Sequence, residues 1–307
     1  MPDGESNVPD LLRWPALDSE QHPWVSQFNS DDLTRAQRDR VRQPYSSAIV
    51  PTIAELSIDI PGDLAAEVDE ATQLLTRFDA EVGPGGLPFA SILLRTESAS
   101  SSEIENLTSG ARAIAEAELG ERETGNAAQI VRNVRTMEAA LALADTIDGE
   151  SIIAMQTALL GTFAPNLTGG WRNEQVWIGG SSLSPHLADF VPPHHDRVPA
   201  AMDDLVAFVG RTDIPALAQV AIAHAQFETI HPFPDGNGRT GRAIVQAMLR
   251  HGQVTTNITA PVSAGLLHDV KDYYDALAAY RRGELRPIIT AFTRAAGYAV
   301  VNGRQLV

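Results

Sequence analysis

Apolar residues recur at helical spacing along most of this chain. Between 64 and 78 they fall at every third or fourth position, directly after a Pro-Gly-Asp sequence, and this pattern predicts a helix. The same kind of pattern predicts helices that begin near 87 and that cover 110–119, 126–147, 151–163, 199–209, 214–230, the stretch leading to 252, 272–280 and 286–297. The chain is therefore expected to be all-α, with a helical bundle as its core.

Two stretches depart from the helical pattern. Residues 1–44 contain several prolines and no period, so we expect an irregular N-terminal arm that wraps on the domain, with Trp14 and Trp24 as its anchors. Residues 168–180 have glycine pairs near both ends and a β-prone Val-Trp-Ile centre, which predicts a small β-hairpin. The expected organisation is the arm, an N-terminal helical region over 45–119 and a core domain over 120–307.

Composition narrows the functional classes. The 307 residues are 44% hydrophobic, and 39 acidic against 23 basic residues give a formal charge of −16. Such a surface repels nucleic-acid phosphates and anionic membranes, so we expect neither as a partner. The chain has no cysteine, which excludes disulfides and thiolate chemistry and suits a cytoplasmic protein. No apolar run reaches the length of a membrane span, and the acidic N-terminus does not resemble a signal peptide.

A polar motif lies between two of the most apolar helical patterns. Residues 231–242 read HPFPDGNGRTGR, which supplies one imidazole, one carboxylate, two guanidiniums and three glycines. One predicted helix runs into this motif and another leaves it. The motif is therefore expected to be a loop held between two helices.

Each residue type in the motif suits phosphate chemistry. Glycines let backbone amides approach a ligand, and the start of the following helix favours an anion. Arg239 and Arg242 are three positions apart, so they share one helical face, where guanidiniums can bind phosphate oxygens. Asp235 is a hard oxygen ligand suited to Mg²⁺, and His231 can accept a proton near pH 7. Alone, each feature is more often structural; together they predict a phosphate-binding loop with a base.

The motif resembles the signature of the Fic family at every defined position, and the preceding HAQFETI at 224–230 is similar to that family as well. Fic proteins typically transfer AMP from ATP to a hydroxyl of a target protein and release pyrophosphate. The resemblance therefore implies the Fic fold, ATP and Mg²⁺ as cofactors, and a target protein, the enzyme's own chain included. It is also compatible with a homodimer. The complete Gly-Asn-Gly-Arg sequence at 236–239 favours AMP transfer over phosphorylation.

The resemblance assigns a role to each residue of the motif. His231 is implied as the general base that takes the proton from a Ser, Thr or Tyr hydroxyl, Phe233 as packing beneath the loop, and Asp235 as the Mg²⁺ ligand. Arg242 is implied to reach the γ-phosphate. The residues implied to bind the nucleotide are Gly236, Asn237, Gly238, Arg239, Thr240, Gly241 and Arg242.

A second motif resembles the family's inhibitory sequence. Ser101, Glu105 and Asn106 match its pattern of Ser or Thr, three residues, Glu, then Gly or Asn. The spacing alone is common on helix surfaces and predicts nothing. Beside a Fic motif, the resemblance implies that Glu105 pairs with Arg242 and places a negative charge where the γ-phosphate must lie. In some relatives the same glutamate supports removal of AMP by orienting water.

Two further segments resemble binding elements of the family. Gln175, Val176, Trp177 and Ile178 match the position of the flap that holds a target segment through main-chain hydrogen bonds, although a purely structural hairpin is the alternative. Tyr274 resembles a tyrosine that contacts the nucleotide near its adenine end, although a helical tyrosine is more often part of the core. Seven positions later, Arg281 stands where some relatives have Asn, which leaves the nucleotide base open.

Three functions follow from these motifs. The first is a protein adenylyltransferase inhibited by Glu105, and the second is a de-AMPylase or bifunctional enzyme that uses the same residue. The third is a non-catalytic ATP-sensing adaptor, against which the intact His231 and both arginines argue. Zinc hydrolysis is disfavoured because His224 and His231 lack the four-residue spacing of a zinc-binding helix.

Overall fold

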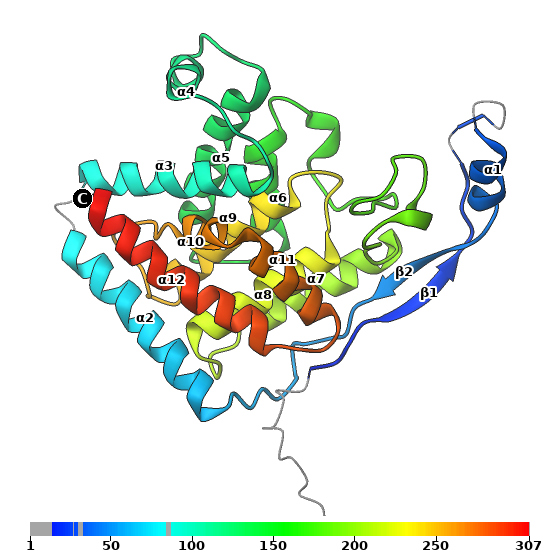
Figure 1. Cartoon of the computed structure of the whole chain (residues 1–307). Coiled ribbons are helices and arrows are strands. Elements are labelled where there is room, and N and C mark those ends of the chain that lie inside the picture. Colours follow the sequence, from blue (N-terminus) through cyan, green and yellow to red (C-terminus); the bar gives the residue numbers. More distant parts are fainter. Residues whose placement is uncertain (1–13, 27, 30–32, 84–86, 307) are drawn as a thin grey trace, which may run out of the picture.

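The computed structural model describes residues 14–26, 28–29, 33–83 and 87–306, which are mostly helical (Figure 1). The helices are α1 (Arg35–Val41), α2 (Gly62–Val82), α3 (Leu87–Ile104), α4 (Ala111–Glu118), α5 (Gly125–Ala142), α6 (Gly149–Leu160), α7 (Val198–Val209), α8 (Ala216–Ile230), α9 (Asn237–His251), α10 (Val262–His268), α11 (Val270–Arg281) and α12 (Arg286–Leu306). The all-α prediction is therefore confirmed, and most predicted helices appear within a few residues of their expected bounds. The helices α1 and α10 were not predicted, because seven residues are too few to display a helical period.

The helix α8 lies at the centre of the core. Its residues are buried from Leu217 to Ile230 without interruption, so other parts of the protein enclose it around its whole circumference. It contacts α7, α9, α11, α12 and α2, and in Figure 1 α12 runs beside α2 across the front of the molecule. The loop that follows α8 is consequently held by a helix that has little freedom to move.

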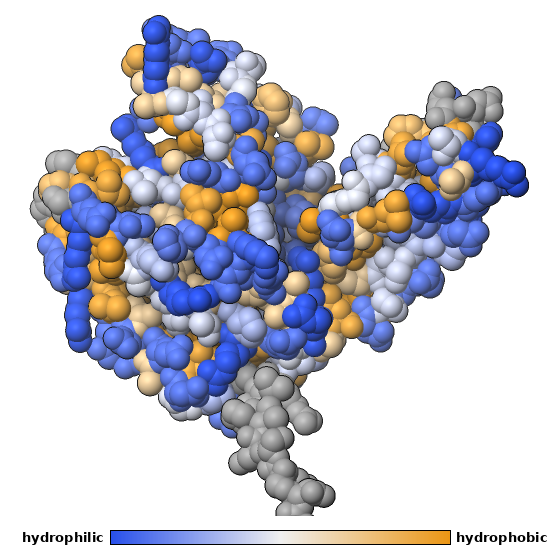
Figure 2. Space-filling view, in the orientation of Figure 1, coloured by the Kyte–Doolittle hydropathy of each residue, from blue (hydrophilic) through white to orange (hydrophobic). Residues whose placement is uncertain are grey.

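The N-terminal arm contains regular structure, so the prediction of an irregular arm is wrong. Strands β1 (Asp18–His22) and β2 (Tyr45–Ile49) pair antiparallel, with His22 opposite Tyr45, and α1 lies at the far end of the pair (Figure 1). Figure 2 shows a hollow between this arm and the helical body. The strand β1 reads DSEQH, which has no apolar alternation, and its partner lies more than twenty positions away. Neither feature leaves a local signal in the sequence.

Both tryptophans anchor the arm, as predicted. The indole of Trp14 is buried, and its ring centroid lies 5.8 Å from that of Tyr280. The backbone N–H of Trp14 donates to the carbonyl of Gly283. Trp24 meets the rings of Tyr45 and Trp177 edge-on, with centroids 5.8 and 5.5 Å apart. The arm therefore packs against the segment that was predicted to be the flap.

The flap segment, residues 168–180, is not a hairpin, and this prediction is also wrong. Among the described residues its only β-pairing is a single bridge between Ile178 and Phe190, ten residues beyond the segment. Gly179 and Gly180 both have positive φ and turn the chain away directly after that bridge. The next extended residues run into two prolines at 192–193, which lack the N–H that a ladder needs.

Within the described residues, no helix combines the length and the apolar composition that crossing a bilayer requires.

Candidate active site

The loop between α8 and α9 is fixed at both ends by left-handed residues. His231 closes α8 with φ of 51°, and Gly236 precedes α9 with φ of 82°. A Cβ atom at Gly236 would lie 2.8 Å from Cδ2 of Leu159, so glycine is required there by space as well as by backbone. The side chain of Asn237 accepts from the N–H of Phe233 at 2.9 Å and donates to its carbonyl at 2.8 Å. The shape of the loop is therefore fixed by its own hydrogen bonds and packing.

Three other residues of the motif act in packing. Phe233 is fully buried beneath the loop, 5.2 Å from Trp171, as the resemblance implied. Gly241 lets α9 approach α8, because a Cβ there would lie 2.9 Å from Cδ1 of Phe227. Thr240 is also fully buried, and neither it nor Gly241 lines the cavities described below. Thr240 and Gly241, which were expected to bind the nucleotide, therefore support the loop from beneath.

His231 is held neutral by its surroundings. Burial lowers the pKa of its imidazole, and the guanidiniums of Arg172 and Arg281 lower it further, to about 4. The charge of Glu105 acts in the opposite direction and is the smaller effect. At neutral pH the ring therefore has a lone pair available for a proton, as a general base requires.

Arg172 positions this histidine, and the sequence did not point to it. Its guanidinium is buried and donates to the carbonyl of His231 at 2.8 Å, to that of Glu174 at 2.9 Å and to that of Pro193 at 2.5 Å. Its backbone N–H donates to the carbonyl of Pro232 at 2.9 Å. One side chain thus connects the flap segment, the motif loop and the chain before α7. A single arginine that follows two glycines and a tryptophan has no sequence signature for this role.

Glu105 and Arg242 form an ion pair. One carboxylate oxygen, Oε1, accepts from Nη2 of Arg242 at 2.8 Å, and Ser101 accepts from the same guanidinium through its hydroxyl at 2.9 Å and its carbonyl at 2.7 Å. Burial raises the pKa of Glu105, but the charge and the hydrogen bond of Arg242 outweigh it, and the net pKa is lowered. The residues 101, 105 and 242 therefore meet as the resemblance implied.

The end of α3 aims Glu105 at this arginine. The N–H of Asn106 donates to the carbonyl of Glu103 at 2.8 Å and the N–H of Leu107 to that of Ser102 at 3.0 Å, which is a Schellman motif. Asn106 has φ of 59°, in the left-handed region that Gly and Asn adopt most readily. This backbone conformation accounts for Gly or Asn directly after the glutamate.

The carboxylate of Glu105 also lies against the start of α9. A Cβ atom at Gly238 would lie 1.9 Å from Oε1 of Glu105 and 3.1 Å from Nη1 of Arg242. The start of a helix presents unpaired amides and favours an anion. Glu105 therefore places negative charge where the loop chemistry predicts a phosphate.

Two cavities meet at this point. The larger has a volume of about 480 Å³ and the smaller about 270 Å³, and both are bordered by Glu105, His231 and Gly238. The smaller one continues along Asp235 and Arg239, and the larger one toward α11. The shared wall contains the expected base and the expected inhibitory carboxylate.

The smaller cavity fits the expected Mg²⁺ and phosphates. The side chain of Asp235 is 56% exposed, and its carboxylate lies 3.7 Å from the guanidinium of Arg239. Arg239 is buried and reaches Gln129 on α5 at 3.4 Å. An accessible carboxylate beside a buried guanidinium suits a hard cation next to phosphate oxygens.

The larger cavity ends at α11. Tyr274 lines it and donates to the carbonyl of Ile104 at 3.0 Å, so it also touches the end of α3. Arg281 lines it as well, with its guanidinium 3.7 Å above the ring of Phe190. Glu228 is buried at the same cavity, and burial raises the pKa of its carboxyl to about 7. The planar guanidinium of Arg281 and the carboxyl group of Glu228 are therefore the groups at this end of the cavity that could recognise a nucleobase.

The flap segment borders a third and more open cavity of about 510 Å³. The amide of Gln175 accepts from the hydroxyl of Tyr45 at 3.1 Å and donates to the carbonyl of Pro192 at 3.0 Å. Val176 and Trp177 line this cavity, whereas Ile178 lines the larger cavity at His231 together with Trp177. The arm thus forms one wall of a groove that leads to the loop at Pro234.

Sequence comparisons agree with this site. The model of the Fic/DOC family matches residues 146–249. Protein adenylyltransferase fic-1 of Caenorhabditis elegans is 29% identical over 149 residues, which are 47% of this chain and 26% of that protein. Protein adenylyltransferase Fic of Nematostella vectensis is 28% identical over 153 residues, 49% of this chain and 32% of that protein. The match therefore spans between a quarter and a third of the length of these relatives.

A structural comparison covers more of the chain. The crystal structure of a Fic family protein from Desulfovibrio desulfuricans G20 matches with a TM-score of 0.65 at 25% identity. The match covers 84% of this chain and 77% of that one. The likeness therefore extends well beyond the residues of the motif.

Proposed function

The chain belongs to the Fic/DOC family and has the Fic fold, and we propose that it is a protein adenylyltransferase that transfers AMP from ATP to a hydroxyl of a target protein. The observation that carries this proposal is the pair of adjoining cavities: the neutral imidazole of His231 and the start of α9 border both, and the guanidinium of Arg242 borders the larger. A base beside an anion-binding helix start suits transfer of a charged phosphate group.

His231 is the proposed general base. It accepts the proton of a Ser, Thr or Tyr hydroxyl, and the hydroxyl oxygen forms a bond with the α-phosphorus of ATP. The bond between that phosphorus and the oxygen leading to the β-phosphate breaks, and pyrophosphate leaves. Arg172 keeps the imidazole in place through the carbonyl of the same residue.

The arginines and the loop amides bind the phosphates. Arg239 and the backbone of 236–238 border the smaller cavity, and Arg242 borders the larger one. Asp235 would hold Mg²⁺, which supplies neutralisation of the phosphate charge when it is bound. The groove between the arm and the flap segment is the proposed path of the target protein.

Glu105 is proposed to inhibit this reaction. Its carboxylate occupies the anion position at Gly238 and engages the guanidinium that the γ-phosphate needs. ATP with its phosphates displaced would not present the α-phosphorus to the hydroxyl, so transfer would be slow until Glu105 moves.

Labelled ATP tests the proposal. The Glu105→Gly protein with Mg²⁺ is expected to label itself from ATP labelled at the α-phosphate and not from ATP labelled at the γ-phosphate. His231→Ala in the same background should abolish labelling while ATP binding stays within a few-fold. Label from the γ-phosphate would indicate a kinase, and no label from either would contradict transferase activity.

Removal of AMP is a second candidate, because Glu105 and His231 border the same two cavities and could together orient a water molecule. Protein that has been labelled by the Glu105→Gly variant would be incubated with wild-type protein and with Glu105→Ala. Release of AMP by the wild type alone would favour this function, and stable label in both would exclude it.

A further inference from the structure

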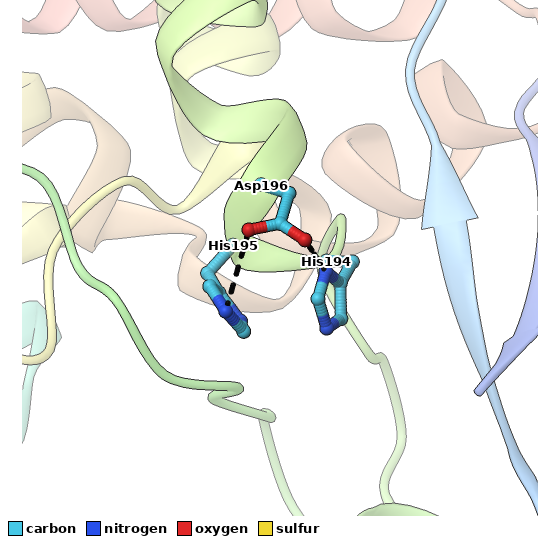
Figure 3. Close-up of side chains that lie close together, drawn as sticks. All are labelled: His194, His195 and Asp196. Atoms are coloured by element: carbon cyan, nitrogen blue, oxygen red, sulfur yellow. Dashed lines mark ion pairs between the residues drawn. The ribbon is translucent and has the colours of Figure 1, made fainter. Parts of the chain in front are cut away.

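Two histidines and an aspartate form a compact cluster outside the candidate active site. Nδ1 of His194 lies 3.3 Å from Oδ2 of Asp196, and Nε2 of His195 lies 3.5 Å from Oδ1 of the same carboxylate. One nitrogen or oxygen of each residue lies within 4.8 Å of those of the other two. Figure 3 shows both imidazoles beside this carboxylate, just before α7.

These contacts are weak as ordinary ion pairs. The two nitrogen–oxygen distances of 3.3 and 3.5 Å are longer than those of a strong, charge-assisted hydrogen bond. The side chain of Asp196 is 78% exposed, so water screens its charge. Pairing with the aspartate therefore does not account for imidazoles crowded at 4.0 Å between ring centroids.

The same geometry is favourable for a metal ion. Zn²⁺ binds neutral imidazole and carboxylate, and in a tetrahedral site with bonds of about 2.0 Å the ligand atoms lie about 3.3 Å apart. The distances of 3.3 and 3.5 Å from the two imidazoles, each to a different oxygen of Asp196, are close to this value, and one ligand atom of each residue lies within 4.8 Å of those of the other two. The side chains of the histidines are 20% and 29% exposed, so an ion can reach them from solvent.

We propose that His194, His195 and Asp196 bind a divalent transition-metal ion of the Zn²⁺ type, with a remaining position open to water. This site is separate from the Asp235 carboxylate and uses different ligand chemistry, since imidazoles suit Zn²⁺ whereas Mg²⁺ prefers oxygen. It does not depend on the proposed adenylyl transfer.

The position of the ion gives it a structural role. The ring of His22 on β1 stacks on His194 at 4.2 Å, and Glu20 on the same strand binds Arg197 through two bonds of 2.6 and 2.7 Å. His194 and His195 also line the cavity between the arm and the flap segment. An ion here would fix the junction at which the arm meets the body.

Metal binding is measured with untagged full-length protein, because a polyhistidine tag would bind the same ions. Titration with Zn²⁺ at pH 7.5 is followed by calorimetry, and titration with Co²⁺ by its visible absorption. We expect one ion per chain in the wild type and at least tenfold weaker binding in His195→Gln and in Asp196→Asn. Both substitutions preserve side-chain size, and circular dichroism would check that the variants fold.

Two control variants separate this cluster from other histidines. His268→Ala removes a histidine that stacks on Tyr298, and His231→Ala removes the one in the active site. Both should keep wild-type stoichiometry and affinity. Absence of binding to the wild type up to 100-fold molar excess of the ion, unchanged binding in His195→Gln, or loss of binding in His231→Ala would overturn the proposal.

Discussion

The carboxylate of Glu105 lies 2.8 Å from the guanidinium of Arg242, although the two residues are 137 positions apart in the chain. The arginine side chain is 2% exposed and the glutamate side chain 38%. The fixed partner is therefore the arginine on α9, and the partner that can move is the carboxylate at the end of α3.

Glu105→Gly is expected to raise self-labelling from ATP by about tenfold or more, because a change of ~1.4 kcal/mol in the barrier already changes a rate tenfold. The variant frees Arg242 and removes the negative charge at Gly238. The measurement is the initial rate of label incorporation with Mg²⁺. Glu103→Gly is the matched control, since this glutamate is exposed on the same helix. An equal increase in both variants would mean that helix loosening, and not the carboxylate, is responsible.

Asn106 is expected to tolerate glycine and to reject a β-branched residue. Asn106→Gly keeps the left-handed conformation and should leave both the melting temperature and the labelling rate unchanged. Asn106→Val forces a branched side chain into that region at a cost of about 1–2 kcal/mol, so it should weaken the end of α3 and raise the labelling rate. Thermal unfolding and labelling are measured on the same samples. Wild-type labelling in Asn106→Val would show that the helix end does not position Glu105.

Arg172→Lys is expected to reduce transfer strongly despite keeping the charge. Lysine cannot reach the carbonyls of His231, Glu174 and Pro193 together, so buried acceptors lose their donors at a cost of about 2–4 kcal/mol. In the Glu105→Gly background we expect a lower turnover number with little change in ATP affinity. Arg304→Lys at an exposed ion pair is the control. A change in ATP affinity alone would argue against a role in positioning His231.

Glu228→Gln is expected to change how stability depends on pH. The folded protein holds a proton on Glu228 up to about pH 7, whereas the ordinary pKa is 4.5. Between these values the folded state binds more protons than the unfolded state, so the free energy of unfolding of the wild type falls as pH rises. Glutamine does not titrate, so the free energy of unfolding of Glu228→Gln should not fall in this way. The variant should therefore be more stable than the wild type at pH 8, by an amount on the order of 3 kcal/mol at most. The advantage should vanish near pH 4.5.

Urea unfolding at a series of pH values measures this difference. The exposed Glu103→Gln serves as the control, and its stability should follow the wild type at every pH. Parallel curves for Glu228→Gln and the wild type would show that Glu228 is not protonated in the folded protein at pH 6.

Local signals made the helices and the motif loop predictable. The apolar pattern of α8 runs directly into His231, and the glycines at 236 and 238 occur where the backbone and the carboxylate of Glu105 leave no room for a side chain. The contact between Glu105 and Arg242 was expected only through resemblance, because no spacing rule relates two residues so far apart. The resemblance does not place every residue correctly. It implies that Gly241 binds the nucleotide, whereas this glycine lets α9 pack against α8.

Long-range contacts made the remainder unpredictable. The strand β1 is polar along its length and is stabilised by pairing with β2 across a gap of more than twenty residues. The glycines of the flap segment predict turns and hence a hairpin, yet Ile178 pairs with Phe190 instead. Arg172 owes its role to four carbonyl groups from three parts of the chain, and none of them is visible in the residues around it.

The Schellman motif at Asn106 would make the proposed inhibition a property of one helix end. Helix ends open at a far lower free energy than the core, so the carboxylate can leave by fraying of the last turn of α3 while the rest of that helix stays packed. Under the proposed inhibition, the affinity for correctly oriented ATP would equal the intrinsic affinity multiplied by the fraction of molecules in which this turn is open. A partner that binds the residues around Asn106 would therefore change the activity by shifting the fraction of molecules in which this turn is open, without contacting the loop at His231.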